Sequence, residues 1–331
     1  MKNTLNRLID HQTLSRNEAC QLLLSVTNNQ VNESQIAALL TTYLMRSITI
    51  DEILGFRDAL LSMTRQIDLK AYDAVDIVGT GGDGKNTFNI STLSSFVVAG
   101  AGYHVAKHGN FGATSISGAS NVLEYFGVKF SKDEARIQES IEKSGVAYLH
   151  APLFNEAMKR VAPVRKALGI RTLFNILGPL INPAQPDKML LGVYNLKLAR
   201  LYAYIYQQTG QAFAIVNSLD GFDEISLTAD FKVIYPDYEE ICSPSDFGFQ
   251  QCNQQELSGG LSIGSAADIF GRVLNNTSTE AQKNCVIINA AYAIQTSNSG
   301  ISIHEAIQAA RESLESGAAK KAFSTFLTIN Q

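Results

Sequence analysis

The fold of this chain is decided by the stretch Val75-Asp76-Ile77-Val78-Gly79-Thr80-Gly81-Gly82-Asp83-Gly84-Lys85-Asn86-Thr87-Phe88-Asn89-Ile90-Ser91-Thr92. It begins with an apolar run typical of a buried strand, passes through a glycine-rich turn and leads into a helical pattern over 91–101. Glycines let the backbone come close to a ligand, and the N–H groups at a helix start attract phosphate. The stretch fits neither G-x-x-x-x-G-K-[ST] nor G-x-G-x-x-G, which weakens ATP-loop and dinucleotide interpretations. We expect a phosphate-binding loop of another class, with an ordinary glycine-rich turn as the alternative.

A second loop of the same character follows one strand–helix unit later. It reads Lys107-His108-Gly109-Asn110-Phe111-Gly112-Ala113-Thr114-Ser115-Ile116-Ser117-Gly118, after a strand expected over 103–107. In an open parallel sheet, ligands bind at the carboxyl ends of the strands. Lys107 supplies a mobile positive charge, and its neighbours favour a ligand role for His108 over a structural one. Two such loops side by side predict a ligand with phosphates at both ends.

A candidate metal site follows a later strand, in Asp220-Gly221-Phe222-Asp223-Glu224-Ile225. Adjacent acids in such a loop are usually only solvated. Beside two phosphate loops they suit Mg²⁺, which binds through one or two carboxylates together with substrate phosphate oxygens. The segment 162–183 adds Arg165, either a bidentate partner for a substrate carboxylate or a surface cation, and a rigid connector, Gly178-Pro179-Leu180.

The pattern along the chain predicts a small helical domain and a larger α/β domain. Residues 1–68 are expected to be all-helical and to serve packing and dimerisation, and helices within 154–181 are expected to complete that domain. Over 69–331, short β-branched runs alternate with helices, which indicates a mostly parallel central sheet covered by helices. Ser131-x-x-Glu134 is interpreted as a capping box that opens a helix.

Composition excludes several classes of protein. The 331 residues are 45% hydrophobic and 18% charged, which fits a globular chain with a sizeable core. The net charge is −4 without a long basic run, which argues against a nucleic-acid-binding protein. The N-terminus lacks a signal-peptide core, and no apolar stretch is long enough to span a membrane. The four cysteines form no C-x-x-C pair, so we expect a reducing, cytoplasmic location and no membrane partner.

In combination, these motifs resemble those of the anthranilate phosphoribosyltransferase family. The matching segments are G-T-G-G-D at 79–83, N-x-S-T at 89–92, K-H-G-N at 107–110, N-x-L-G-P-L-x-N-P at 175–183 and D-G-x-D-E at 220–224. The resemblance covers nearly the whole chain. It implies transfer of the phosphoribosyl group from phosphoribosyl pyrophosphate to anthranilate in tryptophan biosynthesis, which gives N-(5-phosphoribosyl)-anthranilate and pyrophosphate. It also implies two Mg²⁺ ions per subunit, anthranilate bound between the two domains, and a homodimer assembled through the helical domain.

The resemblance assigns roles to individual residues. The catalytic group is Lys107, His108, Asn110 and Arg165. Mg²⁺ is assigned to Ser91, Asp223 and Glu224, and anthranilate to Gly79, Asn110 and Arg165. The residues assigned to phosphoribosyl pyrophosphate are Gly79, Gly82, Asp83, Thr87, Asn89, Ile90, Ser91, Thr92, Lys107, His108, Gly109, Asn110, Phe111, Gly112, Ala113, Thr114, Ser115 and Ala119.

Three positions depart from the usual pattern of the family. Phe111 stands where many members have Arg, Ala119 where they have Ser, and Asn121 where they have Asp. A lost neutral hydrogen bond is worth about 0.5–1.5 kcal/mol, so the departures affect substrate affinity more than reaction type.

Two rival functions are weaker. A pyrimidine nucleoside phosphorylase shares the architecture but usually reads S-T-G-G-V-G-D in its glycine loop and is longer. A non-catalytic, nucleic-acid-binding relative would need a basic groove and degraded phosphate loops, whereas both loops here are intact.

Overall fold

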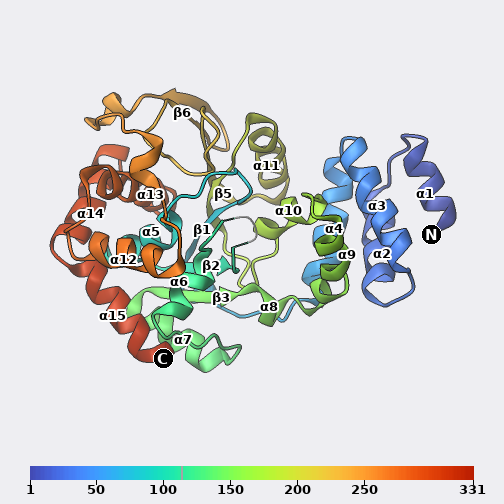
Figure 1. The fold of residues 1–331 in the computed structure, drawn as a ribbon, viewed down its shortest axis with the longest axis horizontal. Coiled ribbons are helices and arrows are strands. Elements are labelled where there is room, and N and C mark those ends of the chain that lie inside the picture. Colours follow the sequence, from blue (N-terminus) through green and yellow to red (C-terminus); the bar gives the residue numbers. More distant parts are fainter. Residues whose placement is uncertain (113–114) are drawn as a thin grey trace. The chain divides into compact units, whose positions relative to one another are not determined.

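The computed structural model describes residues 1–112 and 115–331, and its chain forms two compact units. One unit contains residues 1–67 and 151–185, and the other contains residues 68–150 and 186–331. Figure 1 shows the first unit as helices only, whereas strands run through the second. No helix in the described residues is long and apolar enough to cross a membrane.

The helical unit is built from four N-terminal helices and a returning segment. Side-chain caps fix where α2, α3 and α4 begin, because Ser15, Asn32 and Thr49 each form a capping box. The returning segment consists of short helices and 3₁₀ turns. The elements in chain order are α1 (Lys2–Ile9), α2 (Arg16–Thr27), α3 (Glu33–Met45), α4 (Ile50–Met63), α8 (Ala151–Phe154), η2 (Glu156–Arg160), α9 (Ala162–Leu168), α10 (Leu173–Leu177) and η3 (Gly178–Leu180).

The α/β unit carries the sheet and the helices that cover it. The strands are β1 (Val75–Gly79), β2 (Val105–Gly109), β3 (Val146–His150), β4 (Lys188–Gly192), β5 (Ala212–Ser218), β6 (Phe231–Ile234) and β7 (Glu239–Cys242). The helices are α5 (Ile90–Gly100), α6 (Ala119–Tyr125), α7 (Glu134–Ser144), α11 (Leu196–Thr209), α12 (Ile263–Leu274), α13 (Glu280–Ser297), α14 (Ile303–Glu315) and α15 (Ala318–Asn330). The 3₁₀ turns are η1 (Lys70–Tyr72), η4 (Pro244–Phe247) and η5 (Gln254–Leu257).

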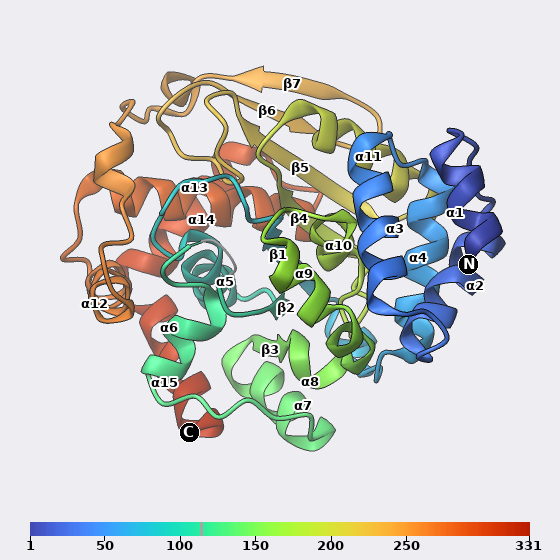
Figure 2. The same cartoon turned by 45° about the vertical axis from the view of Figure 1, so that its right-hand side comes forward.

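The seven strands have the order β3-β2-β1-β4-β5-β6-β7, which Figure 2 shows across one sheet. β1 to β5 are parallel, whereas β6 and β7 are antiparallel. The order reverses between β1 and β4, where Gly79 lies opposite Gly192. Ligands of open α/β sheets bind at such a switch point. The expected fold class, a helical domain with a mostly parallel α/β domain, is therefore confirmed.

Helices cover both faces of the sheet. α5 and α7 both pack against α15, and α5 also packs against α13, so these helices share one layer. α11 packs against β5 and lies on the other side of the strands in Figure 1. α5 is buried along most of its length, and Phe96 on it makes edge-to-face ring contacts with Phe270, Phe323 and Phe326. The aromatic packing fixes the helix whose start faces the glycine loop.

Two local expectations differ from the structure. The β6–β7 hairpin was not expected, because its strands are four residues long and charged Lys232, Glu239 and Glu240 obscure the strand pattern. α7 does not begin with a Ser131–Glu134 capping box. Its N-cap is Asp133, whose carboxylate accepts the Ala135 N–H, while Ser131 Oγ accepts the Asp133 N–H. The carboxylate competes better for the helix N-terminus than a hydroxyl two residues upstream.

A buried ion pair ties the N-terminal helices together. The Glu52 carboxylate pairs with Arg46, and both side chains are almost completely buried. Glu52 also accepts the Leu14 and Thr49 N–H groups at 2.9 Å and the Tyr43 hydroxyl at 3.2 Å.

Replacing Glu52 by Ala leaves the Arg46 guanidinium buried without its carboxylate, which should cost about 3–5 kcal/mol of unfolding free energy. Urea unfolding of Glu52→Ala measures the loss. The matched control is Glu33→Ala, because the Glu33 side chain is 66% exposed and its contact with Arg160 is 3.8 Å long. This change should alter stability by less than about 1 kcal/mol. Equal effects of the two changes would contradict the assignment.

Candidate active site

The site is built at the switch point, where two glycines leave room for one acidic residue. A Cβ atom on Gly79 would lie 2.5 Å from Asp223 Oδ2, and one on Gly192 would collide with the Asp223 carbonyl. Any side chain at either position would therefore displace Asp223. The glycines place the loop after β5 directly over the ends of β1 and β4.

Backbone N–H groups hold the two adjacent carboxylates. Gly81 N–H donates to Asp223 Oδ2 at 2.6 Å, and Ser91 N–H donates to Glu224 Oε1 at 3.0 Å. α5 has no side-chain cap at Asn89, unlike the capped α2, α3 and α4. Glu224 thus occupies part of a helix N-terminus that favours negative charge.

Lys107 is a buried cation that attracts this acidic group. It is buried on β2, and its Nζ donates to the Ile77 carbonyl and, at 3.3 Å, to Ser91 Oγ. Burial lowers the pKa of Lys107 to about 8, against the attraction of Asp76, Glu224 and Asp223. Sequence reasoning missed Asp76, which is fully buried and accepts the His108 N–H at 3.3 Å. An acid inside an apolar strand was the signal that could have identified it.

Ionisation of the three carboxyl groups of this site is unfavourable. Burial, followed by the charge of Asp83, raises the pKa of Asp223 to about 7. Burial and the charge of Asp223 raise the pKa of Glu224 well above its ordinary value, and burial raises that of Asp83. Oxygen donors that repel one another suit a hard divalent cation such as Mg²⁺.

The described side chains supply only part of the ligands that a metal ion needs. In the described part of the chain, no three His, Cys, Asp or Glu side chains gather as a complete metal site. Mg²⁺ keeps several waters and takes substrate phosphate oxygens as ligands, so a pair of carboxylates beside two predicted phosphate loops fits it. The residues present therefore fit a magnesium ion that is shared with a phosphorylated substrate.

The two loops that the sequence predicts to bind phosphate are joined to each other. Asn89 Nδ2 donates to the Ser117 carbonyl at 3.1 Å, and the Ile116 N–H donates to Asn86 Oδ1 at 3.3 Å. Buried polar atoms without a hydrogen-bond partner remain along the loops, namely Thr80 Oγ1, Asn89 Oδ1 and Ser117 Oγ. Unpaired buried polar atoms cost free energy unless a ligand satisfies them. Thr80 and Ser117 were not among the predicted site residues.

The second loop is held by Asn121, one of the departures from the family pattern. Asn121 Oδ1 accepts the N–H groups of Gly112 and Gly118 at 2.9 and 3.0 Å. The amide thus supplies the acceptor that a carboxylate would supply. Phe111 packs edge-on against His150, with ring centroids 4.9 Å apart. Ala119 opens α6, while Ala113 and Thr114 lie outside the described residues.

The structure gathers most of the predicted residues at one edge of the sheet in the α/β unit. The glycine loop follows β1, Lys107, His108 and Gly109 end β2, and Asp223 and Glu224 follow β5. Thr87 pairs with Ser258, and exposed Asn110 accepts the Phe111 N–H with its own side chain. Ile90, Ser91 and Thr92 form the first turn of α5, Gly82 precedes Asp83, and Ser115 begins the segment that leads to α6.

Arg165 belongs to the helical unit, on α9. Its guanidinium lies over the Phe174 ring at 5.5 Å, and burial lowers its pKa. No carboxylate of the described residues pairs with it. A half-buried guanidinium of this kind is suited to a planar carboxylate ligand.

Comparison with known proteins identifies the family. The helical bundle domain of a glycosyl transferase family matches residues 2–63, and the a/b domain of that family matches residues 71–320. Anthranilate phosphoribosyltransferase from Bacteroides fragilis is 54% identical over the full length of both chains. The chain belongs to the anthranilate phosphoribosyltransferase family. Its Flavobacterium johnsoniae relative is 52% identical, over 97% of each chain.

Solved structures of the anthranilate phosphoribosyltransferase family share the fold over nearly the whole chain. The enzyme from Thermus thermophilus is 31% identical, with a TM-score of 0.92 over 98% of both chains. The enzyme from Saccharomyces cerevisiae, in complex with PRPP and Mg, is 27% identical, with a TM-score of 0.89 over 99% of this chain and 98% of its own. Another structure of the yeast enzyme is in complex with 4-fluoroanthranilate.

The raised pKa of Asp223 predicts how a magnesium ion held by these carboxylates would stabilise the folded chain. The ordinary pKa of the carboxyl is 3.8 and the folded value is about 7. The stability that protonated Asp223 contributes is therefore complete below about pH 4 and is lost as pH rises through 7. Mg²⁺ binds the ionised form, so the rise in melting temperature that Mg²⁺ causes should grow between pH 6 and 8. Thermal melting with and without Mg²⁺ measures this.

The control is Asp223→Asn, which retains an oxygen acceptor for the Gly81 N–H but does not titrate. In this variant the magnesium effect should be small and its increase with pH much reduced. A magnesium effect independent of pH in the unaltered protein would contradict the prediction.

Proposed function

We propose that this chain transfers the phosphoribosyl group from phosphoribosyl pyrophosphate to anthranilate, as the names of its full-length relatives state for them. The observation that carries the proposal is the buried Asp223–Glu224 pair over the switch point, with Lys107 and two phosphate loops beside it. Such a site is built to hold a polyphosphate ester through a divalent cation. The product is N-(5-phosphoribosyl)-anthranilate, an intermediate of tryptophan biosynthesis.

The cation ligands in this proposal are Ser91 Oγ and the carboxylates of Asp223 and Glu224. Two Mg²⁺ ions per subunit would use this set, with the substrate's phosphate oxygens completing their coordination. When bound, Mg²⁺ stabilises the negative charge that grows on the departing pyrophosphate. Support comes from the mutual repulsion of these carboxylates and from the magnesium-bound yeast relative.

The chain's own residues stabilise the same developing charge. The anthranilate amine attacks C1 of the ribose and pyrophosphate leaves, through an oxocarbenium-like transition state. The ammonium of Lys107 is held in place by its two hydrogen bonds, so little reorganisation is needed as charge develops. The backbone at the start of α5 adds N–H dipoles. Gly79, Gly82, Asp83, Thr87 and Asn89 are proposed to line the pyrophosphate and ribose, and Lys107 through Ser115 to hold the remaining phosphates.

Positioning of anthranilate is assigned to Asn110, Arg165 and the backbone near Gly79. An aromatic amine is neutral at pH 7 and can lose its proton after attack, so no general base is required. Holding anthranilate in the correct orientation for attack can lower the activation barrier by several kcal/mol. Arg165 supports this role because its guanidinium is half-buried and stacked on Phe174.

We also propose that the protein is a homodimer and lies in the cytoplasm. Met45 is 81% exposed at the end of α3, and Ile9 and Leu44 are also exposed on the helical unit. We propose that these exposed apolar side chains contribute to the interface with a second copy of the chain. All four cysteines are free, in agreement with a reducing compartment.

The reaction and its metal are tested together by the loss of anthranilate fluorescence. Turnover should require both phosphoribosyl pyrophosphate and Mg²⁺, and the Asp223→Asn plus Glu224→Gln variant should lose magnesium-dependent turnover. The matched control is Asp220→Asn in the same loop, where the carboxylate accepts the Thr228 hydroxyl. This control should turn over like the unaltered protein. Wild-type kinetics of the double variant would remove the metal assignment.

Removing the Arg165 guanidinium should affect one substrate selectively. A hydrogen bond to a charged group contributes about 1.5–3 kcal/mol, so Arg165→Ala should raise the KM for anthranilate roughly 10–100-fold. The KM for phosphoribosyl pyrophosphate should change about twofold or less. Arg165→Lys keeps the charge but not the planar fork, and should fall between the two. Equal effects on the KM values of both substrates would contradict the assignment of Arg165 to anthranilate binding.

A further inference from the structure

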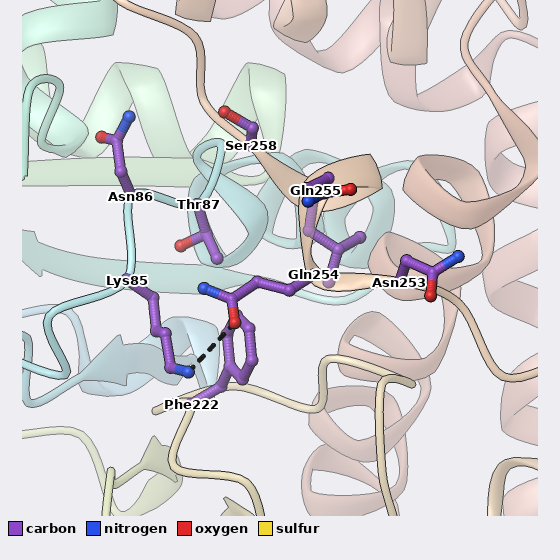
Figure 3. A pocket seen from close by; sticks show the side chains of 9 residues that line it. Lys85, Asn86, Thr87, Phe222, Asn253, Gln254, Gln255 and Ser258 are labelled. Carbon is purple, nitrogen blue, oxygen red and sulfur yellow. Dashed lines mark hydrogen bonds between the residues drawn. The ribbon is translucent and has the colours of Figure 1, made fainter.

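The two predicted phosphate loops are anchored in different ways. The first is tied at an exposed point, where Lys85 Nζ donates to Gln254 Oε1 at 3.3 Å beside a cavity (Figure 3). Water competes for both partners of such a contact. The second loop lies against a group of buried polar side chains, so its position depends on the interior of the α/β unit. These side chains are Ser120, Tyr148 and His150.

Ser120 is the centre of this buried group. Its Oγ lies 2.7 Å from the Tyr148 hydroxyl and 2.8 Å from His150 Nδ1, so one hydroxyl joins the two other side chains. Ser120 is fully buried, and His150 is only 6% exposed. A hydroxyl can donate one hydrogen bond and accept two, so Ser120 can satisfy both partners at once. Removing the hydroxyl would take the same hydrogen-bond partner from two buried groups, which is unfavourable.

Gly109, at the end of β2, makes room for this network. It lies opposite His150 in the parallel register of β2 and β3. A Cβ atom on Gly109 would lie 2.3 Å from the Tyr148 hydroxyl oxygen. A side chain at this position would therefore push the Tyr148 hydroxyl away from Ser120. The glycine lets the tyrosine reach the first turn of α6.

The network is bonded to the second loop through the first turn of α6. The Ser120 N–H donates to the Asn110 carbonyl at 3.1 Å. The next residue, Asn121, accepts the N–H groups of Gly112 and Gly118 at 2.9 and 3.0 Å. A shift of this turn would therefore disturb three hydrogen bonds that shape the loop. One of them holds Asn110, which is proposed to contact both substrates.

Aromatic rings hold His150 in place and connect it to the loop a second time. The Phe130 ring stacks on the His150 ring with centroids 4.3 Å apart, and the Phe111 ring meets it edge-on at 4.9 Å. Burial lowers the pKa of His150 to about 4, so the imidazole is neutral at pH 7 and packs without the cost of a buried charge. Phe111 follows Asn110 in the loop, so this ring contact fixes the same segment.

We propose that Ser120 and His150 are positioning residues, which hold Asn110 and Phe111 in the conformation that binds phosphoribosyl pyrophosphate. Both side chains are buried, so they act through the loop and not on the substrate. The identity of the substrate rests on the proposed function, whereas the coupling of the buried network to the loop does not. A loop that is already held in its binding conformation costs little to order, so loosening it should weaken substrate binding more than it slows the chemical step.

Amide hydrogen exchange of the ligand-free chain, followed residue by residue by NMR, tests the positioning role. Ser120→Ala removes the central hydroxyl and should speed exchange of the Gly112 and Gly118 N–H groups roughly tenfold or more. Ser120→Cys should give an intermediate rate, because a thiol is a weaker hydrogen-bond partner. The matched control is Ser313→Ala, which removes another buried hydroxyl, bonded to the Val97 carbonyl, and should leave both N–H groups unchanged.

His150→Phe separates the hydrogen bond from the ring contacts. It keeps a ring between Phe111 and Phe130 but cannot bond to Ser120, so it should speed exchange of the same loop N–H groups by a smaller factor than Ser120→Ala. Exchange in the loop that is unchanged in both variants overturns the proposal. Exchange that rises equally at Ile215 in the central strand β5 also overturns it, because the whole α/β unit would then be opening.

Steady-state kinetics of the same variants tests the link to the substrate. Ser120→Ala should raise the KM for phosphoribosyl pyrophosphate about fivefold or more and change kcat about twofold or less. A variant that is merely less stable would lose folded protein, which lowers kcat per chain and leaves KM unchanged. An unchanged KM would overturn the link to phosphoribosyl pyrophosphate. The exchange measurements contain no substrate, so their result is independent of whether the transferase assay succeeds.

Discussion

The structure depends on the burial of two adjacent carboxylates, Asp223 and Glu224, above the point where the sheet order reverses. Charged carboxylates lose their hydration there and repel one another, and Asp83 adds to that repulsion. Two backbone N–H groups and buried Lys107 offset only part of this cost. A folded protein keeps such an arrangement where a cationic ligand compensates it.

The rest of the α/β unit holds these acids in place. The chain beyond Glu224 is anchored by buried Asn289 on α13, which accepts the Ile225 N–H at 3.1 Å and donates to the Ile225 carbonyl at 2.8 Å. α13 packs against α5, whose own start is bonded to Glu224. The central helices therefore fix both ends of the acidic segment, and the aromatic cluster around Phe96 keeps α5 from moving. This packing makes the α/β unit rigid where the charged side chains must be held in position.

The start of α5 differs from the capped helix starts that both units contain. In the helical unit, side chains close the N-termini of α2, α3 and α4, so those ends serve stability. In the α/β unit, α5 begins without a side-chain cap, and the Ser91 N–H in its first turn donates to Glu224. The buried side-chain oxygens of Thr80, Asn89 and Ser117 also lack a hydrogen-bond partner within the described residues. A bound ligand would supply that partner.

The sequence by itself determined most of the elements and the positions of the glycines and acids in the loops between them. Strand–loop–helix order, glycines at 79–84 and the acids at 223–224 are local patterns, so they predicted a parallel sheet and its loops. Only the tertiary structure placed Asp76 beside the His108 N–H, Asn289 beside Ile225 and Gly192 under Asp223, because those partners are distant in the sequence. The same holds for the β6–β7 hairpin and the cavity at Lys85. Local patterns report backbone preference and burial, whereas the electrostatic state of a buried group depends on which distant residues the fold brings beside it.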